Sequence, residues 1–179
     1  MNQLTKRQKY IIKETISYAI IIVLAVVIAL LINRFLIVNA RVPTSSMVPT
    51  INKLDRIIGN RLAYINKAPE RGDIIIFPFP DNEKETYVKR IIGLPGETVE
   101  IRGGVVYING SPLDESSYLT VETLGDWGPY YVTLDSYFVL GDNRNNSKDS
   151  RYWDNKFVSR DKIMAKALFK YYRGFEIFD

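Results

Sequence analysis

The fold of this chain is decided by residues 16–38, which read ISYAIIIVLAVVIALLINRFLIV. Between Tyr18 and Ile32 no side chain is charged or strongly polar. A helix that crosses a membrane needs roughly 20 apolar residues, each adding about 1.5 Å. A buried helix of a soluble protein fits less well, because this stretch has no polar face. The pattern therefore predicts one transmembrane helix, with Arg34 near its far end able to reach the headgroups.

Basic residues gather directly in front of this predicted helix. Lys6, Arg7, Lys9 and Lys13 outweigh Glu14 and give the first fourteen residues a net charge of +3, whereas the whole chain carries only +4. Such a basic flank marks the cytoplasmic side of a transmembrane helix. Since the rest of the chain is nearly neutral, its charge does not indicate a nucleic-acid partner.

The sequence thus predicts a cytoplasmic segment over residues 1–15, a transmembrane anchor over 16–38 and an extracytoplasmic domain over 39–179. A cleavable signal peptide is the alternative, because Val38 and Ala40 follow the apolar stretch at a spacing suitable for cleavage. The length of the apolar stretch favours an uncleaved anchor.

The sequence contains no cysteine and no histidine. These absences exclude a disulfide framework, a thiolate nucleophile, a cysteine or histidine metal site and a Ser-His-Asp triad. Any general base must therefore be Asp, Glu, Lys or Tyr.

Most of the chain beyond the anchor predicts β-strands. Short runs rich in β-branched and aromatic residues occur at residues 73–77, 87–92, 98–102, 105–108, 137–140 and 164–172. Gly103-Gly104 predicts a two-residue hairpin. Residues 111–131 are polar and irregular, predict a long loop or small excursion and are assigned no chemistry. The predicted fold is mainly β: one N-terminal transmembrane helix followed by a β-rich, partly open barrel-like domain.

Two adjacent hydroxyls, Ser45 and Ser46, lie in the loop PTSSMVPT at residues 43–50. A serine becomes a nucleophile only when a base removes its proton. Without histidine, the best base is a lysine whose pKa is lowered by burial among apolar side chains. The loop itself leaves the choice between the two serines open.

Lys89 is the lysine that fits this requirement, because it lies in the apolar run YVKRII at residues 87–92. Strand alternation places Lys89 and Arg90 on opposite faces, so that one of the two points inward. The alternative is that both are ordinary surface cations on an edge strand.

A third candidate segment, GDNRNNSKDSRYW, covers residues 141–153. It could be a solvated loop or a calcium loop, although Asp142, Asn146 and Asp149 lack the spacing of an EF-hand and no glutamate closes the set. The functional interpretation is a hydrogen-bond network with both aspartates paired to arginines and a serine beside the base.

These segments together resemble the bacterial type I signal peptidases, the serine–lysine leader peptidases, in their compact Gram-positive form. The four matching segments are residues 43–50, 72–77, 87–96 and 141–153, and they follow an N-terminal anchor in the family's order. The resemblance implies that Ser46 is the nucleophile and Lys89 the general base. It also implies that the Thr44 hydroxyl, where relatives usually have serine, forms the oxyanion hole with the Ser46 N–H.

The resemblance implies supporting roles for further residues. Ser147 would hydrogen-bond the lysine amine, Asp149 and Arg151 would form a structural ion pair, and Met47 would line the pocket for the P1 side chain. Asp142 would tie the loop to the strand by pairing with Arg90 or Arg144.

The implied function is cleavage of signal peptides from secretory preproteins after small residues at P1 and P3. It needs no cofactor and no metal, and the partners are preproteins and the lipid bilayer, with the oligomeric state left open. One alternative is a self-cleaving repressor of the DNA-damage response, but those proteins begin with a DNA-binding domain. Another is a non-catalytic, membrane-anchored β-domain that binds exported proteins.

Overall fold

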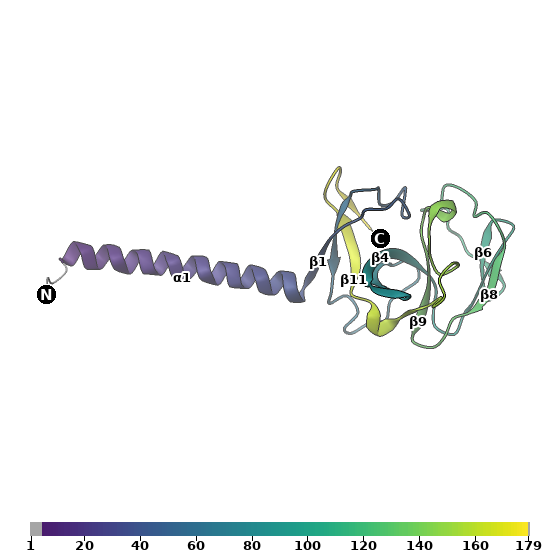
Figure 1. Cartoon of the computed structure of the whole chain (residues 1–179), viewed down its shortest axis with the longest axis horizontal. Helices are drawn as coiled ribbons and strands as arrows, with labels where there is room; N and C mark the ends of the chain where they lie inside the picture. The colour runs from purple at the N-terminus through teal and green to yellow at the C-terminus, as the bar shows by residue number, and fades with distance from the viewer. Residues whose placement is uncertain (1–4, 179) are drawn as a thin grey trace. The chain divides into compact units, whose positions relative to one another are not determined.

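The computed structural model describes residues 5–178 and divides the chain into an N-terminal helical unit and a β-domain that begins at Ile37. Helix α1 (Lys6–Phe35) starts with a capping box, in which the Thr5 side chain accepts a bond from the Gln8 N–H and the Gln8 side chain accepts one from the Thr5 N–H. The helix is continuous over these residues (Figure 1), and none of its residues is buried. By length and composition, α1 is suited to cross a membrane.

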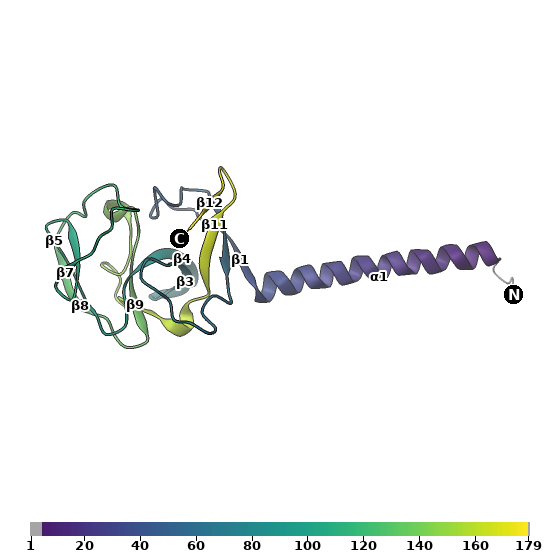
Figure 2. The ribbon, with the colours of Figure 1, turned by 180° about the vertical axis from the view of Figure 1, so that it is seen from behind.

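The larger sheet of the β-domain has eight strands, all paired antiparallel. They are β1 (Ile37–Arg41), β2 (Arg56–Asn60), β3 (Ile74–Phe79), β4 (Asn82–Gly93), β9 (Ser136–Leu140), β10 (Val158–Ser159), β11 (Ala165–Lys170) and β12 (Glu176–Ile177). The order is β1-β2-β11-β3-β4-β9-β10, with β12 paired to β11. Figure 2 labels β1, β11, β12, β3, β4 and β9 of this sheet. Because β1 and β10 end this order without pairing to each other, the sheet stays open.

A second, four-stranded antiparallel sheet lies beyond β9 (Figures 1 and 2). Its strands are β5 (Thr98–Arg102), β6 (Val105–Ile108), β7 (Ser111–Pro112) and β8 (Trp127–Tyr131), in the order β7-β6-β5-β8. Two 3₁₀ helices, η1 (Arg144–Asn146) and η2 (Arg160–Lys162), complete the elements.

The predicted class, an apolar N-terminal helix followed by an antiparallel β-domain, is confirmed. Helix α1 is longer at its start than the predicted anchor, and Ile37 and Val38 belong to β1. The prediction of a loop over residues 111–131 was wrong in part, because β7 and β8 lie there. Pro129 argued against a strand, but β8 is an edge strand, where a missing N–H is tolerated.

The core is continuous through β9, whose five residues are all buried. Tyr137 and Val139 pack with Trp153 in one apolar cluster, while Phe138 and Leu140 pack with residues of β5 and β6 in another. Because side chains alternate along a strand, β9 joins the two sheets. Its end at Leu140 fixes where the loop starting at Gly141 begins.

Candidate active site

The serine loop follows β1 and is anchored by its methionine. Met47 is fully buried in a cluster with Val42, Ile51 and Ile57, and its carbonyl accepts a bond from the Ile51 N–H. Ser46 next to it is only 8 % exposed. Met47 was predicted to line a substrate pocket, but it lies in the core and not in the wall of the adjoining cavity.

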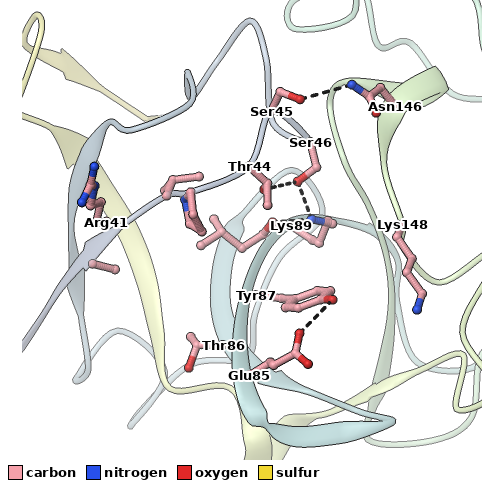
Figure 3. Close-up of a pocket in the computed structure, with 14 residues that line it drawn as sticks. Arg41, Thr44, Ser45, Ser46, Glu85, Thr86, Tyr87, Lys89, Asn146 and Lys148 are labelled. Carbon is pink, nitrogen blue, oxygen red and sulfur yellow. Dashed lines mark hydrogen bonds between the residues drawn. The ribbon is translucent and has the colours of Figure 1, made fainter.

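Lys89 of β4 meets this serine directly. Its Nζ donates to Ser46 Oγ at 2.7 Å and to the Val88 carbonyl at 3.0 Å (Figure 3). The alternative of two surface cations is wrong, because Lys89 and Arg90 are only 3 % and 5 % exposed. Strand β4 lies between β3 and β9, although β9 joins it only from Arg90 onward. Strand alternation holds, but both faces of β4 are covered here.

Burial changes the acidity of this lysine. Loss of solvent lowers the pKa of the Lys89 amine from 10.5 to about 8, and the carboxylates of Asp149 and Asp142 oppose that shift only in part. A substantial fraction of the amine is therefore neutral near pH 8. A neutral amine hydrogen-bonded to an alcohol can accept the alcohol's proton.

Thr44 lies on the same side of the loop as the serine. Its Oγ1 is 3.4 Å from Ser46 Oγ, and the two hydroxyls and the Lys89 amine form a short row (Figure 3). The Thr44 hydroxyl thus lies beside the Ser46 hydroxyl, and the predicted second donor is the Ser46 N–H. Such donors stabilise negative charge on a carbonyl oxygen.

The loop after β9 is folded by ion pairs, as the hydrogen-bond interpretation of residues 141–153 expected. Arg90 holds both carboxylate oxygens of Asp142, at 2.8 and 2.7 Å, and Thr50 donates to the same carboxylate at 2.6 Å. Arg151 holds Asp149 in the same bidentate manner, at 2.8 and 2.9 Å. Bidentate pairs of this kind fix geometry as well as charge.

Arg144 has a partner that the sequence analysis missed. Its guanidinium does not pair with the Asp142 carboxylate but donates to both oxygens of Glu115, at 2.9 and 2.5 Å. Tyr118 donates to the same carboxylate at 2.7 Å. Glu115 lies in the segment to which no chemistry was assigned. No motif around Glu115 marked it, since an isolated acid in a polar segment is usually solvated.

Ser147 is buried, and its Oγ has no hydrogen-bond partner among the described residues. The expected bond from Ser147 to the Lys89 amine is therefore absent from this arrangement. Ser147 does lie close to the backbone of Ser46, because a Cβ added at Gly141 would be 2.2 Å from Ser147 Oγ and 2.4 Å from the Ser46 carbonyl oxygen.

A cavity of about 510 Å³ opens beside Ser46 and Lys89, the pair that is called the dyad from here on. Its walls are residues 40–46 from β1 and the serine loop, residues 85–89 of β4, and Asn146 and Lys148 (Figure 3). Residues 85–89 have β3 on one side only, since β9 joins β4 from Arg90 onward. The cavity thus lies between two strand edges without partners. Within residues 5–178, no group of three or more acidic side chains is arranged to hold a metal ion.

Known proteins resemble this chain over most of its length. A family described as "Signal peptidase, peptidase S26" matches residues 15–172. Signal peptidase I of Leptolyngbya laminosa is 43 % identical over 130 residues, covering 69 % of this chain and 63 % of that protein. Signal peptidase I of Bacillus amyloliquefaciens is 45 % identical over 133 residues, covering 69 % and 67 %.

Among solved structures, a signal peptidase I from Enterococcus faecalis V583 shares 38 % sequence identity, with a TM-score of 0.48 over 56 % of this chain and 97 % of that one. The chain spans less than two thirds of the length of the first curated relatives, at 63 %, 57 % and 65 %.

Proposed function

Because this chain belongs to the signal peptidase family, peptidase S26, we propose that it is a membrane-anchored serine endopeptidase. It removes N-terminal signal peptides from secretory preproteins and cuts after small residues at P1 and P3. The observation that carries this proposal is the buried 2.7 Å hydrogen bond between Ser46 Oγ and Lys89 Nζ at the wall of an open cavity.

Acylation begins when the neutral Lys89 amine accepts the Ser46 proton while Oγ attacks the scissile carbonyl. The electron pair of the carbonyl moves to its oxygen, which the Thr44 hydroxyl and the Ser46 N–H stabilise. The Lys89 ammonium then gives its proton to the leaving amine. The mature protein departs, and the signal peptide stays bound to Ser46 as an ester.

Deacylation repeats the same steps with water as the nucleophile. Lys89 takes a proton from the water as it attacks the ester, and returns the proton to Ser46 Oγ as the signal peptide leaves. The step regenerates the alcohol and the neutral amine. The low exposure of Lys89 keeps the amine in the form that both steps require.

The substrate binds as an extended strand in the cavity between residues 40–44 and residues 85–89. Two strand edges without partners offer main-chain hydrogen bonds to such a peptide. In an extended peptide, P1 and P3 point to the same side. Both side chains therefore meet the protein wall, and both are required to be small.

Helix α1 anchors the enzyme in the membrane, with the basic residues of its first turns on the cytoplasmic side and the β-domain outside. This topology places the dyad on the side of the membrane where the cleavage site of an exported preprotein emerges.

The test is cleavage of a purified preprotein, with alanine at P1 and P3, by the full chain in detergent. The expected result is a single cut after the P1 alanine, seen by mass spectrometry of both products, and none by the Ser46→Ala variant. A preprotein with tryptophan at P1 should remain intact. A wild-type chain that does not cut, or a Ser46→Ala variant that still does, would contradict the proposal.

A further inference from the structure

Asn143 contacts the serine loop through two separate groups. Its side-chain Nδ2 donates to the Ser45 carbonyl at 3.0 Å, and its main-chain N–H donates to the Ser46 carbonyl at 3.0 Å. Neither bond involves the reacting hydroxyl. The residue therefore holds the backbone of the serine loop rather than its nucleophile.

The bond to the Ser45 carbonyl fixes a particular peptide plane. The Ser45–Ser46 peptide is trans, so the Ser45 carbonyl and the Ser46 N–H lie in one plane and point in opposite directions. With the carbonyl tied to Asn143, the Ser46 N–H points away from Asn143. Among the described residues this N–H has no acceptor, which leaves it free for an incoming oxyanion.

Asn143 is itself held in a rigid frame. Gly141 donates its N–H to Asp149, and the neighbouring Arg144 donates to the Gly141 carbonyl as well as to Glu115. Arg151 in turn donates to the Arg144 carbonyl at 2.6 Å. The frame fixes the loop on either side of Asn143, so the Asn143 amide can fix a peptide plane in another loop.

We propose that Asn143 is a positioning residue that orients the Ser46 N–H as an oxyanion donor by hydrogen bonding the carbonyl of the same peptide. This inference rests on the proposed peptidase function. Without the bond, the Ser45 carbonyl keeps only the 3.2 Å bond from the Val48 N–H. The Ser45–Ser46 peptide is then held less firmly, and a rotation of it turns the N–H out of line with the developing charge. A misplaced donor stabilises the transition state less well, whereas binding of the substrate is unchanged.

Two variants test this inference. Asn143→Asp keeps the side-chain shape but sets an oxygen against the Ser45 carbonyl, and Asn143→Ala removes the group. The expected loss in kcat is about 10- to 100-fold, below that for removing an oxyanion donor entirely. The KM should change less than about twofold, because Asn143 is not part of the cavity wall.

A matched control is Asn145→Ala. Asn145 lies on the same loop and also makes two side-chain bonds, but it accepts from the Leu124 N–H and donates to the Glu122 carbonyl rather than to the serine loop. This variant should keep its kcat within about twofold of wild type.

The inhibition constants of two peptide inhibitors distinguish a positioning defect from a folding defect. A peptide aldehyde matching the signal-peptide end bonds its carbonyl carbon to Ser46 Oγ, with the Ser46 proton passing to Lys89 and the electron pair to the aldehyde oxygen. Its inhibition constant should rise by the same factor as kcat falls. The same peptide ending in an alcohol forms no such bond and should bind unchanged.

The outcomes are distinguishable. If wild type cuts the preprotein and Ser46→Ala does not, the peptidase function stands. If both Asn143 variants then keep kcat and aldehyde affinity within twofold of wild type, or lose affinity for both peptides alike, the positioning role is refuted. If wild type itself does not cut, the proposed function fails first.

Discussion

Lys89 and Arg90 are consecutive cations of β4, both buried, yet their surroundings differ in kind. Arg90 binds both oxygens of Asp142, donates to the Gly72 carbonyl and lies 4.1 Å from the centre of the Tyr118 ring. Lys89 faces the opposite side of the strand and, within the described chain, donates to an alcohol and one carbonyl and to no carboxylate.

The difference supports the proposal that Arg90 is structural whereas Lys89 is the general base. An arginine keeps its proton in any protein, so burial is tolerated only with a carboxylate partner. A lysine buried without a carboxylate partner loses its proton more readily. Arg90 has a paired carboxylate and Lys89 has none. This difference supports a structural role for Arg90 and the proposed role of proton acceptor for Lys89.

The largest expected effect comes from replacing Lys89 with arginine, so that β4 carries two consecutive arginines. Lys89→Arg keeps the charge but removes a proton acceptor, and kcat should fall by about 10³-fold or more, as for loss of a general base. Lys84→Arg, on an exposed part of the same strand, should cut preprotein at the wild-type rate. Substantial turnover by Lys89→Arg would end the distinction between the two cations.

A substitution at Gly141 tests how closely the residues around the Ser46–Lys89 pair are packed. It precedes Asp142, but a Cβ there would meet Ser147 Oγ and the Ser46 carbonyl within 2.4 Å and force the serine loop away from Lys89. Gly141→Ala should lower kcat by about 100-fold, as expected when reacting groups move by about 1 Å. Wild-type kcat for this variant would show that the dyad tolerates displacement.

A substitution of Arg90 should affect the stability of the fold more than catalysis. Arg90→Met leaves the Asp142 carboxylate buried without its cation and should lower the free energy of unfolding by about 3–5 kcal/mol. The double variant Arg90→Met with Asp142→Leu should recover most of that loss in thermal unfolding. If Arg90→Met instead unfolds like wild type but loses activity a thousandfold, the arginine is not structural.

The smallest effect is a gain in stability. A lysine pKa lowered to about 8 means that the unfolded chain binds a proton that the folded one does not, between about pH 8 and 10.5. This cost is fully present below about pH 8 and vanishes above about pH 10.5. Lys89→Met should therefore be more stable at pH 7 by about 1–3 kcal/mol, with the gain shrinking at alkaline pH.

The sequence predicted the fold best where local signals are strong. The apolar stretch and the β5–β6 hairpin at Gly103-Gly104 followed from local patterning. Strand β1 was missed because Ile37 and Val38 continue the apolar stretch and were assigned to the anchor, and β2 because Ile57-Ile58 is a short apolar pair followed by Gly59. Strand β8 was missed because a proline on an edge strand looks like a break.

The candidate site divides in the same way. Resemblance named Ser46 and Lys89, and the structure brings their side chains together across 43 positions of sequence. Residue patterns could not show that Lys89 and Arg90 are both buried, since this depends on loops folding over both faces of β4. Glu115 and the two bonds of Asn143 were also unpredictable, because ion pairs and backbone clamps between distant loops leave no periodic signal.

The most direct test of the central claim is the pH dependence of kcat/KM for preprotein cleavage, which reports ionisation in the free enzyme. With a neutral Lys89 as the base, kcat/KM should rise tenfold per pH unit below about pH 8 and level off above it. A profile that stays flat from pH 5 to pH 9 would contradict the assignment of an uncharged lysine as the general base.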